Sequence, residues 1–314
     1  TAILYISHKL TEIAELCEAA TVLRLGQVVA TCDPRETSPA QMAELMVGTV
    51  LQSPVRAARP EGPVRLALRG LTAPAPHRFG TALRDVNLTV RGGEVLGIGG
   101  VAGNGQDELV AALSGEMKVG AGMVLLDDRP VGNAAVDLRR GAGLLCGPEE
   151  RLGHAAAPDM TLTENALMTA VVRKKLARNG FLRWPAAHSF AQEIIKAFDV
   201  RTPGPENTAR SLSGGNLQKF VIGREIMQDP KVLVVNQPTW GVDASAAAAI
   251  RQALLTLADQ GVAVVVISQD LDELMEISDR FCALTDGRLS QPRPAQGLSV
   301  EEIGMMLGGA HDME

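Results

Sequence analysis

The sequence predicts an α/β fold that combines a parallel core sheet, an antiparallel β layer and a helical subdomain. First, apolar runs at 231–236 and 262–268 enclose a helical pattern, an order typical of parallel strands. Second, shorter runs at 65–71 and 83–90 read as strands of an antiparallel layer. Third, residues 161–200 are mostly helical in pattern, which predicts the helical subdomain.

Length and composition limit the class of protein. The 314 residues suggest about two domains, and a hydrophobic content of 46% is enough for a sizeable core. The net charge of −6 argues against a nucleic-acid surface, which needs a basic stripe, so we expect no nucleic-acid partner. No apolar run approaches the ~20 residues of a membrane span. The four cysteines form no C-x-x-C pair, so we expect no metal ligands and no disulfide framework.

An internal repeat predicts how the chain is organised. Residues 6–28 and 267–289 match at a constant offset in Ile, Ser, Leu, Glu, Glu, Leu and Gly. Both segments read as strand, short helix, strand and Gly turn, and both precede a small helix ending in glycine. One explanation of the match is chance similarity between two strand–helix–strand units. We interpret the repeat as a tandem duplication whose first copy is present only as its last ~50 residues. Since Thr1 runs straight into an apolar segment, we expect the N-terminus to be a cut.

Three parts follow from this interpretation. Residues 1–48 are a C-terminal remnant of a first domain, residues 49–63 are a linker, and residues 64–314 are a complete second domain. The linker has three prolines and no apolar periodicity. Within the second domain we place the helical subdomain at about 150–228.

The remaining elements of the second domain follow in chain order from apolar runs and helix end signals. Gly115 ends one helix, and the Thr161-x-x-Glu164 pattern begins another. The expected elements are a buried strand at 94–100, a helix at 106–115, strands at 123–128 and 143–146, and helices at about 214–228 and 243–259.

A glycine-rich segment joins the strand at 94–100 to the following helix. Such a loop can point several backbone N–H groups into one concavity at the positive end of a helix. The pattern G-x-x-x-x-G-K-[ST] fits its glycines, but Gln106 stands at the Lys position and Asp107 at the Ser/Thr position. Packing alone is an equally common reason for such a turn. The candidate phosphate-binding residues are Gly100, Gly103, Asn104, Gly105, Gln106 and Asp107.

The most specific stretch is SLSGGNLQK at 211–219. Ser213 can cap a helix, and the two glycines after it let the helix N-terminus approach a phosphate closely. A plain Ser/Gly helix cap is the alternative. The stretch resembles the signature of ABC ATPases, LSGGQ, in its LSGGNQQK variant. The resemblance covers nearly the whole chain and implies a P-loop NTPase-like ABC ATPase domain that binds ATP and Mg²⁺. The implied nucleotide contacts here are Ser213, Gly214, Gly215 and Asn216.

The doubled domain and the LSGGN form look like the importers of simple sugars and nucleosides. The run at 147–168 is similar to that of nucleoside-importer ATPases that work with basic-membrane-protein-type lipoproteins. The resemblance implies an ATP-binding subunit that energises uptake of nucleosides or simple sugars, peripheral to the cytoplasmic face of the membrane. The implied partners are transmembrane permease subunits, another ATP-binding subunit and, indirectly, a periplasmic or lipoprotein solute-binding protein.

The same comparison implies that the second domain has lost charged residues at its own ATP site. In this family the strand after the signature ends in Asp-Glu, which hold Mg²⁺ and position the attacking water. Asn236 and Gln237 stand there instead, and Gln269 replaces the switch His. Amides cannot act as general bases near neutral pH. With Gln106 for Lys, and Glu149 at the family's Q-loop position, we expect weak or static nucleotide binding without hydrolysis.

The residues kept in family form serve the other site of a head-to-tail domain pair. In ABC proteins each ATP lies between the phosphate loop of one domain and the signature of the other. The signature at 211–219, the D-loop Asp243 and the switch residue His8 of the first copy would all serve the first domain's ATP. His8 is the expected catalytic residue of that site.

Two alternative interpretations remain open. One is a soluble regulatory or ribosome-associated ABC-type ATPase, which the acidic balance disfavours. The other is a non-enzymatic binding module, and we expect the fragment alone to show no sustained hydrolysis. Smaller ambiguities concern Phe79, an adenine-stacking or loop residue, and Trp240, which we expect in interface packing. The basic run at 173–178 is expected to be a solvated helix face, with a place near the membrane or permease as the alternative.

Overall fold

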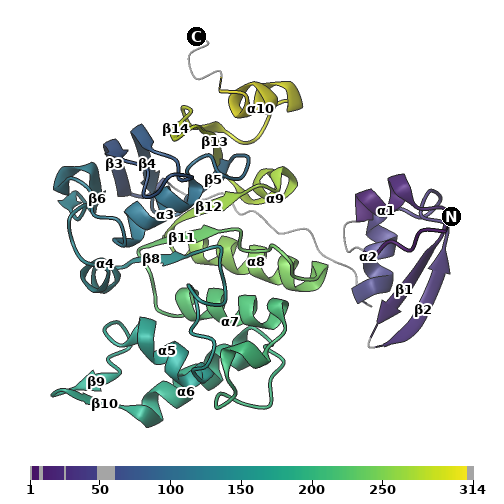
Figure 1. Cartoon of the computed structure of the whole chain (residues 1–314), viewed down its shortest axis with the longest axis horizontal. Coiled ribbons are helices and arrows are strands. Elements are labelled where there is room, and N and C mark those ends of the chain that lie inside the picture. The colour runs from purple at the N-terminus through teal and green to yellow at the C-terminus, as the bar shows by residue number, and fades with distance from the viewer. Residues whose placement is uncertain (1, 7–9, 25, 48–60, 310–314) are drawn as a thin grey trace.

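The computed structural model describes residues 2–6, 10–24, 26–47 and 61–309. The N-terminal part contains α1 (Leu10–Leu16), β1 (Ala20–Arg24), β2 (Gln27–Cys32) and α2 (Pro39–Val47). The two strands form an antiparallel sheet of their own, with α2 packed on it, as Figure 1 shows. The expected strand at the start of the first repeat is absent from the described residues, because 2–6 is exposed and pairs with no strand.

The main sheet is built of parallel strands, as the sequence predicts. Its order is β14-β13-β5-β12-β11-β8, with the short β15 (Arg293–Pro294) paired to β13. The pairs from β8 through β13 are parallel, and β14 and β15 are antiparallel additions at one edge. These strands are β5 (Val95–Gly99), β8 (Leu144–Gly147), β11 (Val232–Asn236), β12 (Ala263–Ser268), β13 (Arg280–Thr285) and β14 (Arg288–Leu289). Strands buried on both faces need apolar residues at nearly every position, which explains their Val-rich runs.

An antiparallel layer of order β4-β3-β6-β7 packs over one face of the main sheet. Along β4 the buried side chains of Val86, Leu88 and Val90 alternate with exposed polar residues, so the layer presents one face to the core and one to solvent. The layer and the main sheet enclose α3 (Gln106–Ser114) in one hydrophobic core. The layer consists of β3 (Val64–Ala73), β4 (Leu83–Arg91), β6 (Val124–Leu126) and β7 (Arg129–Pro130), with the 3-10 turn η1 (Ala121–Met123) before β6.

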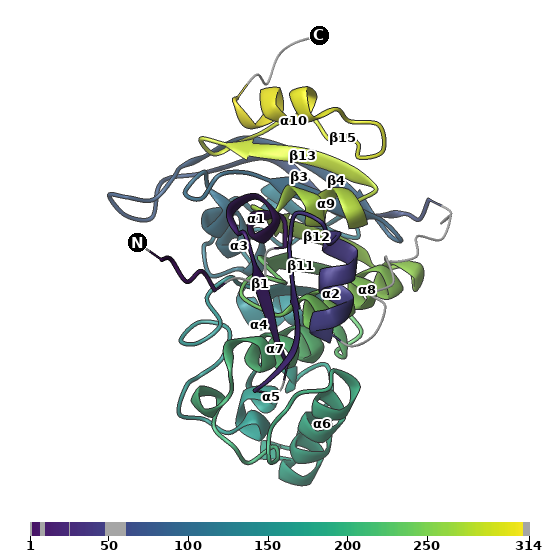
Figure 2. The ribbon, with the colours of Figure 1, turned by 90° about the vertical axis from the view of Figure 1, so that its right-hand side faces the viewer.

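Helices cover the other face of the main sheet and form a second core with it. They are α8 (Ala244–Asp259), α9 (Leu271–Ile277) and α10 (Val300–Leu307), while α4 (Val136–Ala142) precedes β8. Side chains cap the N-termini of α8 and α10: Asp243 accepts from the amide of Ala246, and Ser299 and Glu302 form a capping box. Figure 2 shows α10 at one end of the molecule and α5 and α6 at the other.

The helical part has its own core between α5 (Leu162–Ala170), α6 (Trp184–Ala197) and α7 (Gly214–Ile226). The predicted Thr161–Glu164 capping box begins α5. A buried ion cluster ties α7 to α4, because Glu225 pairs with both Arg140 and Arg224. Burial favours the neutral acid, but the two guanidinium groups hold the pKa of Glu225 below its ordinary value.

One expectation for this part is wrong. The run at 173–178 is not a helix face, because α5 ends at Ala170 and a β-hairpin of β9 (Ala177–Arg178) and β10 (Phe181–Leu182) interrupts the helical stretch. Asn179 and Gly180 take left-handed backbone angles that a helix cannot accommodate. The short 3-10 turn η2 (Ala209–Ser211) leads into α7.

No helix in the described part of the chain is long and apolar enough to cross a membrane.

Candidate functional site

The glycine-rich loop lies where β5 ends and α3 begins, at the carboxyl edge of the parallel sheet. Gly103 and Gly105 have φ of 84° and 110°, angles that other residues rarely adopt. At Gly100 a Cβ would lie 2.6 Å from the carbonyl oxygen of Leu284 and 2.7 Å from Nε2 of Gln106. The backbone therefore requires glycine at these positions. The same requirement is typical of phosphate-binding loops that precede a helix N-terminus.

The side chain of Gln106 folds back into this loop. Its Oε1 accepts from the backbone N–H of Asn104 at 3.0 Å, and its Nε2 donates to the carbonyl of Val101 at 2.9 Å. Gln106 is 7% exposed. Asn104 Oδ1 accepts in turn from the amide of Asp286, which ties the loop to the turn after β13. A backbone N–H that an anion would need is thus already bonded to the chain's own carboxamide.

The next residue, Asp107, meets the end of β11. Asn236 Nδ2 donates to Asp107 Oδ1 at 3.1 Å, while the buried Oδ1 of Asn236 has no hydrogen-bond partner among the described residues. Burial raises the pKa of Asp107, and the neighbouring Glu108 adds to the rise. A carboxylate and an amide therefore stand together at the first turn of α3.

The ends of β11 and β12 bring the other two amides to the same place. Gln237 has a left-handed φ of 52°, and its backbone N–H donates to the carbonyl of Ile267 at 2.8 Å. The backbone N–H of Gln269 donates to Gln237 Oε1 at 3.5 Å. Gln106, Asn236, Gln237 and Gln269 therefore converge, because the carboxyl ends of neighbouring parallel strands share one edge.

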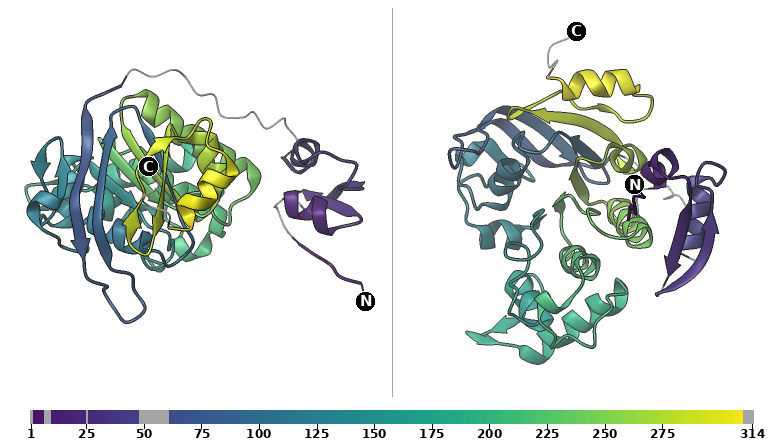
Figure 3. Two further views of the ribbon diagram at one scale, coloured as in Figure 1. Left: turned by 90° about the horizontal axis from the view of Figure 1, so that it is seen from above. Right: turned by 45° about the vertical axis from the view of Figure 1, so that its right-hand side comes forward.

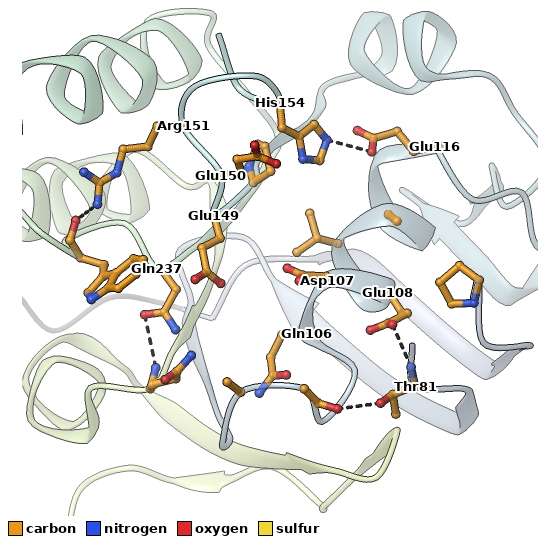
Figure 4. Close-up of a pocket in the computed structure, with 18 of the residues that line it drawn as sticks. Thr81, Gln106, Asp107, Glu108, Glu116, Glu149, Glu150, Arg151, His154 and Gln237 are labelled. Carbon is orange, nitrogen blue, oxygen red and sulfur yellow. Dashed lines mark hydrogen bonds and ion pairs between the residues drawn. The ribbon is translucent and has the colours of Figure 1, made fainter. Parts of the chain in front are cut away.

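Gln106, Gln237 and Gln269 border a cavity of about 1230 Å³, drawn in Figure 4. Five carboxylates line it: Asp107, Glu108, Glu116, Glu149 and Glu150. Three of them are engaged: Asp107 accepts from Asn236, Glu108 accepts from the amide of Thr81 at 2.9 Å, and Glu116 pairs with His154 at 2.9 Å. Burial, followed by the charge of Asp107, raises the pKa of Glu149. The cavity is acidic, with Arg151 as its one Lys or Arg among the lining residues.

The signature residues lie on the helical part. Ser213 caps α7, its Oγ accepting from the amide of Asn216 at 3.5 Å and from Nδ2 of the same residue at 2.9 Å. Ser213 and Gly214 are exposed, and none of the residues from Ser213 to Asn216 lines the cavity. The structure therefore separates the two predicted groups: the loop and the amides form one cluster, and the signature faces solvent elsewhere.

Of the other candidates, Phe79 and Trp240 are both exposed and line the cavity. Asp243 caps α8. Burial alone would raise the pKa of Asp243, but the hydrogen bonds that it accepts from Ser245 and Ala246 outweigh this effect and lower the pKa. His8 lies outside the described residues.

The sequence did not single out Arg151. Its guanidinium donates to the carbonyl of Trp240, and a Cβ on Gly214 would lie 3.0 Å from its Nη1. The residue thus stands between the cavity and the signature helix, as Figure 4 shows for its contact with Trp240. No local pattern marks it, because the contact joins segments 89 positions apart.

The described residues hold no group of three or more His, Cys, Asp or Glu arranged to bind a metal ion.

Comparison with known proteins gives independent evidence for the family to which the chain belongs. The family model described as ABC transporter matches residues 83–240. The chain is 38% identical over 99% of its length to the glucose import ATP-binding protein TsgD13 of Haloferax volcanii. It is 36% identical over 95% of its length to the guanosine import ATP-binding protein NupO of Bacillus subtilis. It spans 57% and 59% of the lengths of these two relatives.

Solved structures show the same fold. The dimeric cassette MJ0796 of a bacterial ABC transporter aligns over 74% of this chain and 100% of its own, with a TM-score of 0.62 and 22% identity. The likeness confirms the predicted P-loop NTPase-like arrangement of parallel sheet, antiparallel layer and helices. With the family match over residues 83–240, it leads to one conclusion: the chain belongs to the ABC transporter family.

Proposed function

We propose that this chain is part of an ATP-binding subunit of an ABC importer for nucleosides or simple sugars. The relatives named above are import ATP-binding proteins for glucose and guanosine, and they match nearly the whole chain. The observation that carries the proposal is the solvent-facing signature at the N-terminus of α7, in its LSGGN form. A helix N-terminus with two glycines suits contact with phosphates brought by another domain.

We place residues 1–48 at the end of a first nucleotide-binding domain, 49–63 in a linker and 64–314 in a second domain. The two copies of the repeat support this division: α1 and β1 of the first copy correspond to α9 and β13 of the second. Most of the linker lies outside the described residues.

The second domain's own pocket is, in this proposal, a degenerate ATP site. Its residues fit a magnesium triphosphate poorly. Gln106 occupies the loop in place of a phosphate-neutralising Lys, and Asp107 brings a carboxylate where the family has a hydroxyl. Gln237 and Gln269 supply neither a base nor a cation. ATP and Mg²⁺ therefore bind there weakly or not at all.

The working site is the composite one. ATP held by the first domain's phosphate loop is closed over by Ser213, Gly214 and Gly215, whose backbone dipoles stabilise charge on the γ-phosphate. His8 is the switch residue of that same site, and Asp243 reaches it from the D-loop. Closure rocks a transmembrane permease at the cytoplasmic face of the membrane, and a solute-binding protein delivers the solute on the other side.

The test is G214W in the polypeptide that carries both nucleotide-binding domains. A bulky side chain there blocks the helix N-terminus, so ATP hydrolysis and uptake should fall at least ~100-fold. The control is G204W, because a Cβ at Gly204 meets nothing within 4 Å. Near-normal turnover by the G214W protein would refute the assignment.

A further inference from the structure

The segment between α5 and α6 forms a hairpin; with Trp184, the first residue of α6, it makes up residues 171–184, which we call the basic hairpin. It projects from the outer end of the helical part, as Figures 1 and 3 show. Arg178 lies opposite Phe181 across the two short strands. The turn residues Asn179 and Gly180 both have positive φ, 52° and 81°, as a type I′ turn requires. The hairpin is therefore a defined local structure that places Arg178 and Phe181 side by side next to its turn.

The base of the basic hairpin is fixed to the protein core. Arg173 Nε donates to the carbonyl of Gln228 at 2.7 Å, beyond the C-terminal end of α7. Lys174 pairs with Asp229 at 2.9 Å and lies 5.5 Å from the ring centroid of the buried Phe190. These contacts use the first two cations of the segment for structure and hold the tip away from the body.

The tip exposes large apolar side chains. Phe181 is 79% exposed, Leu182 46% and Trp184 48%. The chain has only nine aromatic residues, six Phe, two Trp and one Tyr, so two of them on one short hairpin is a marked concentration. Adjacent exposed apolar side chains indicate an interaction surface.

The charge of the segment is opposite to that of the whole chain. Residues 171–184 hold five basic and no acidic residues, whereas the chain has a net charge of −6. Beyond the two cations at the base, Lys175, Arg178 and Arg183 are exposed beside the apolar tip. Their stems are long enough to keep the charge in water while the tip is buried.

We propose that the basic hairpin binds the surface of an anionic lipid bilayer. Phe and Trp favour the membrane–water interface, and Lys and Arg are drawn to anionic headgroups. A lipid surface satisfies both features at once, since exposed cations and exposed apolar side chains lie together on one small projection. A protein groove would have to match each of these side chains individually. This surface is separate from the nucleotide pockets, so it can fail while the proposed transport function holds.

The experiment is co-sedimentation of the chain with vesicles of phosphatidylcholine, with and without phosphatidylserine. We expect binding only with phosphatidylserine, weakened by added salt. K175E/R178E should lower the partition coefficient about thirty-fold or more, and F181S/L182S about ten-fold.

Two matched controls keep the result specific. K118E/R129E makes the same charge change at exposed positions in the loop after α3 and in β7, and V300S/M305S removes exposed apolar side chains from α10. Both should bind vesicles as the unaltered chain does. Equal binding by the hairpin variants and their controls would overturn the proposal. So would unchanged lipid binding by hairpin variants that lose co-purification with a permease, because the occupant would then be a protein.

Discussion

Gln106 illustrates how one side chain can change an anion-binding loop while its backbone stays the same. The glycines that shape the loop are present, and α3 begins where a phosphate would sit. The carboxamide nevertheless bonds to the N–H of Asn104 and to the carbonyl of Val101, so the loop is satisfied without a ligand. An anion has to displace these bonds and also meet the carboxylate of Asp107. Both effects act against nucleotide binding.

The double substitution Q106K/D107T should therefore create affinity for Mg–ATP. It supplies a charged donor to the phosphates and removes the nearby carboxylate, so we expect binding about ten- to a hundred-fold tighter than in the unaltered chain. Isothermal titration calorimetry measures the change. Q252K/D137T makes the same charge change at exposed positions and should have no effect. If Q106K/D107T bound no tighter, the side chains of the loop would not be what limits affinity.

At the scale of elements, the packing of α6 against α7 depends on a glycine inside a helix, where no turn requires one. Gly223 lies within α7, and a Cβ there would be 2.4 Å from Cδ2 of Phe198. The ring of Phe198 fills the space over the helix backbone. A helical glycine normally weakens a helix, so its presence here is explained by this close approach.

G223A should destabilise the protein despite the higher helix propensity of alanine. The added methyl group has to displace the Phe198 ring, at a cost of about 1–3 kcal/mol in the free energy of unfolding. The matched control is G304A in α10, where a Cβ meets nothing within 4 Å. That change should stabilise by up to about 1 kcal/mol. Urea unfolding measures the free energy of unfolding of both variants. Equal changes in G223A and G304A would contradict the prediction, because the Phe198 ring would then move aside without cost.

Most elements could be predicted because their signals are local. The Val-rich runs give buried parallel strands, and Thr161 with Glu164 gives the start of α5. The basic hairpin was missed because the four cations of the run at 173–178 look like a solvated helix face, while the Asn179–Gly180 turn directly after them determines the structure. The strand expected at the start of the first repeat does not form within residues 2–6, since this segment has no neighbouring strand among the described residues, unlike β12 between β5 and β11.

The candidate site shows the same division between what is local and what is not. The convergence of Gln106, Gln237 and Gln269 follows from strand ends and could be foreseen. The bond between Asn236 and Asp107 and the place of Arg151 depend on side-chain contacts across 129 and 89 positions. No pattern in a single sequence encodes such contacts.

At the scale of the whole molecule, the two groups of nucleotide-contact candidates have opposite character. One group surrounds an acidic cavity that we propose to be a degenerate ATP site. The other is an exposed helix N-terminus with its glycines and serine cap intact. In the proposed head-to-tail pair of domains these groups would belong to different ATP sites. The chain is therefore expected to contribute to catalysis at its partner domain's site and not at its own.

The most direct measurement is steady-state ATP hydrolysis by the purified chain in the presence of Mg²⁺. If the cavity is the degenerate ATP site that we propose, with amides in place of the phosphate-neutralising Lys, the catalytic carboxylates and the switch His, phosphate should be released no faster than in the background without protein. Sustained hydrolysis that disappears when Gly105 or Gln106 is replaced would contradict this expectation, because the pocket at β5 and α3 would then be a working active site.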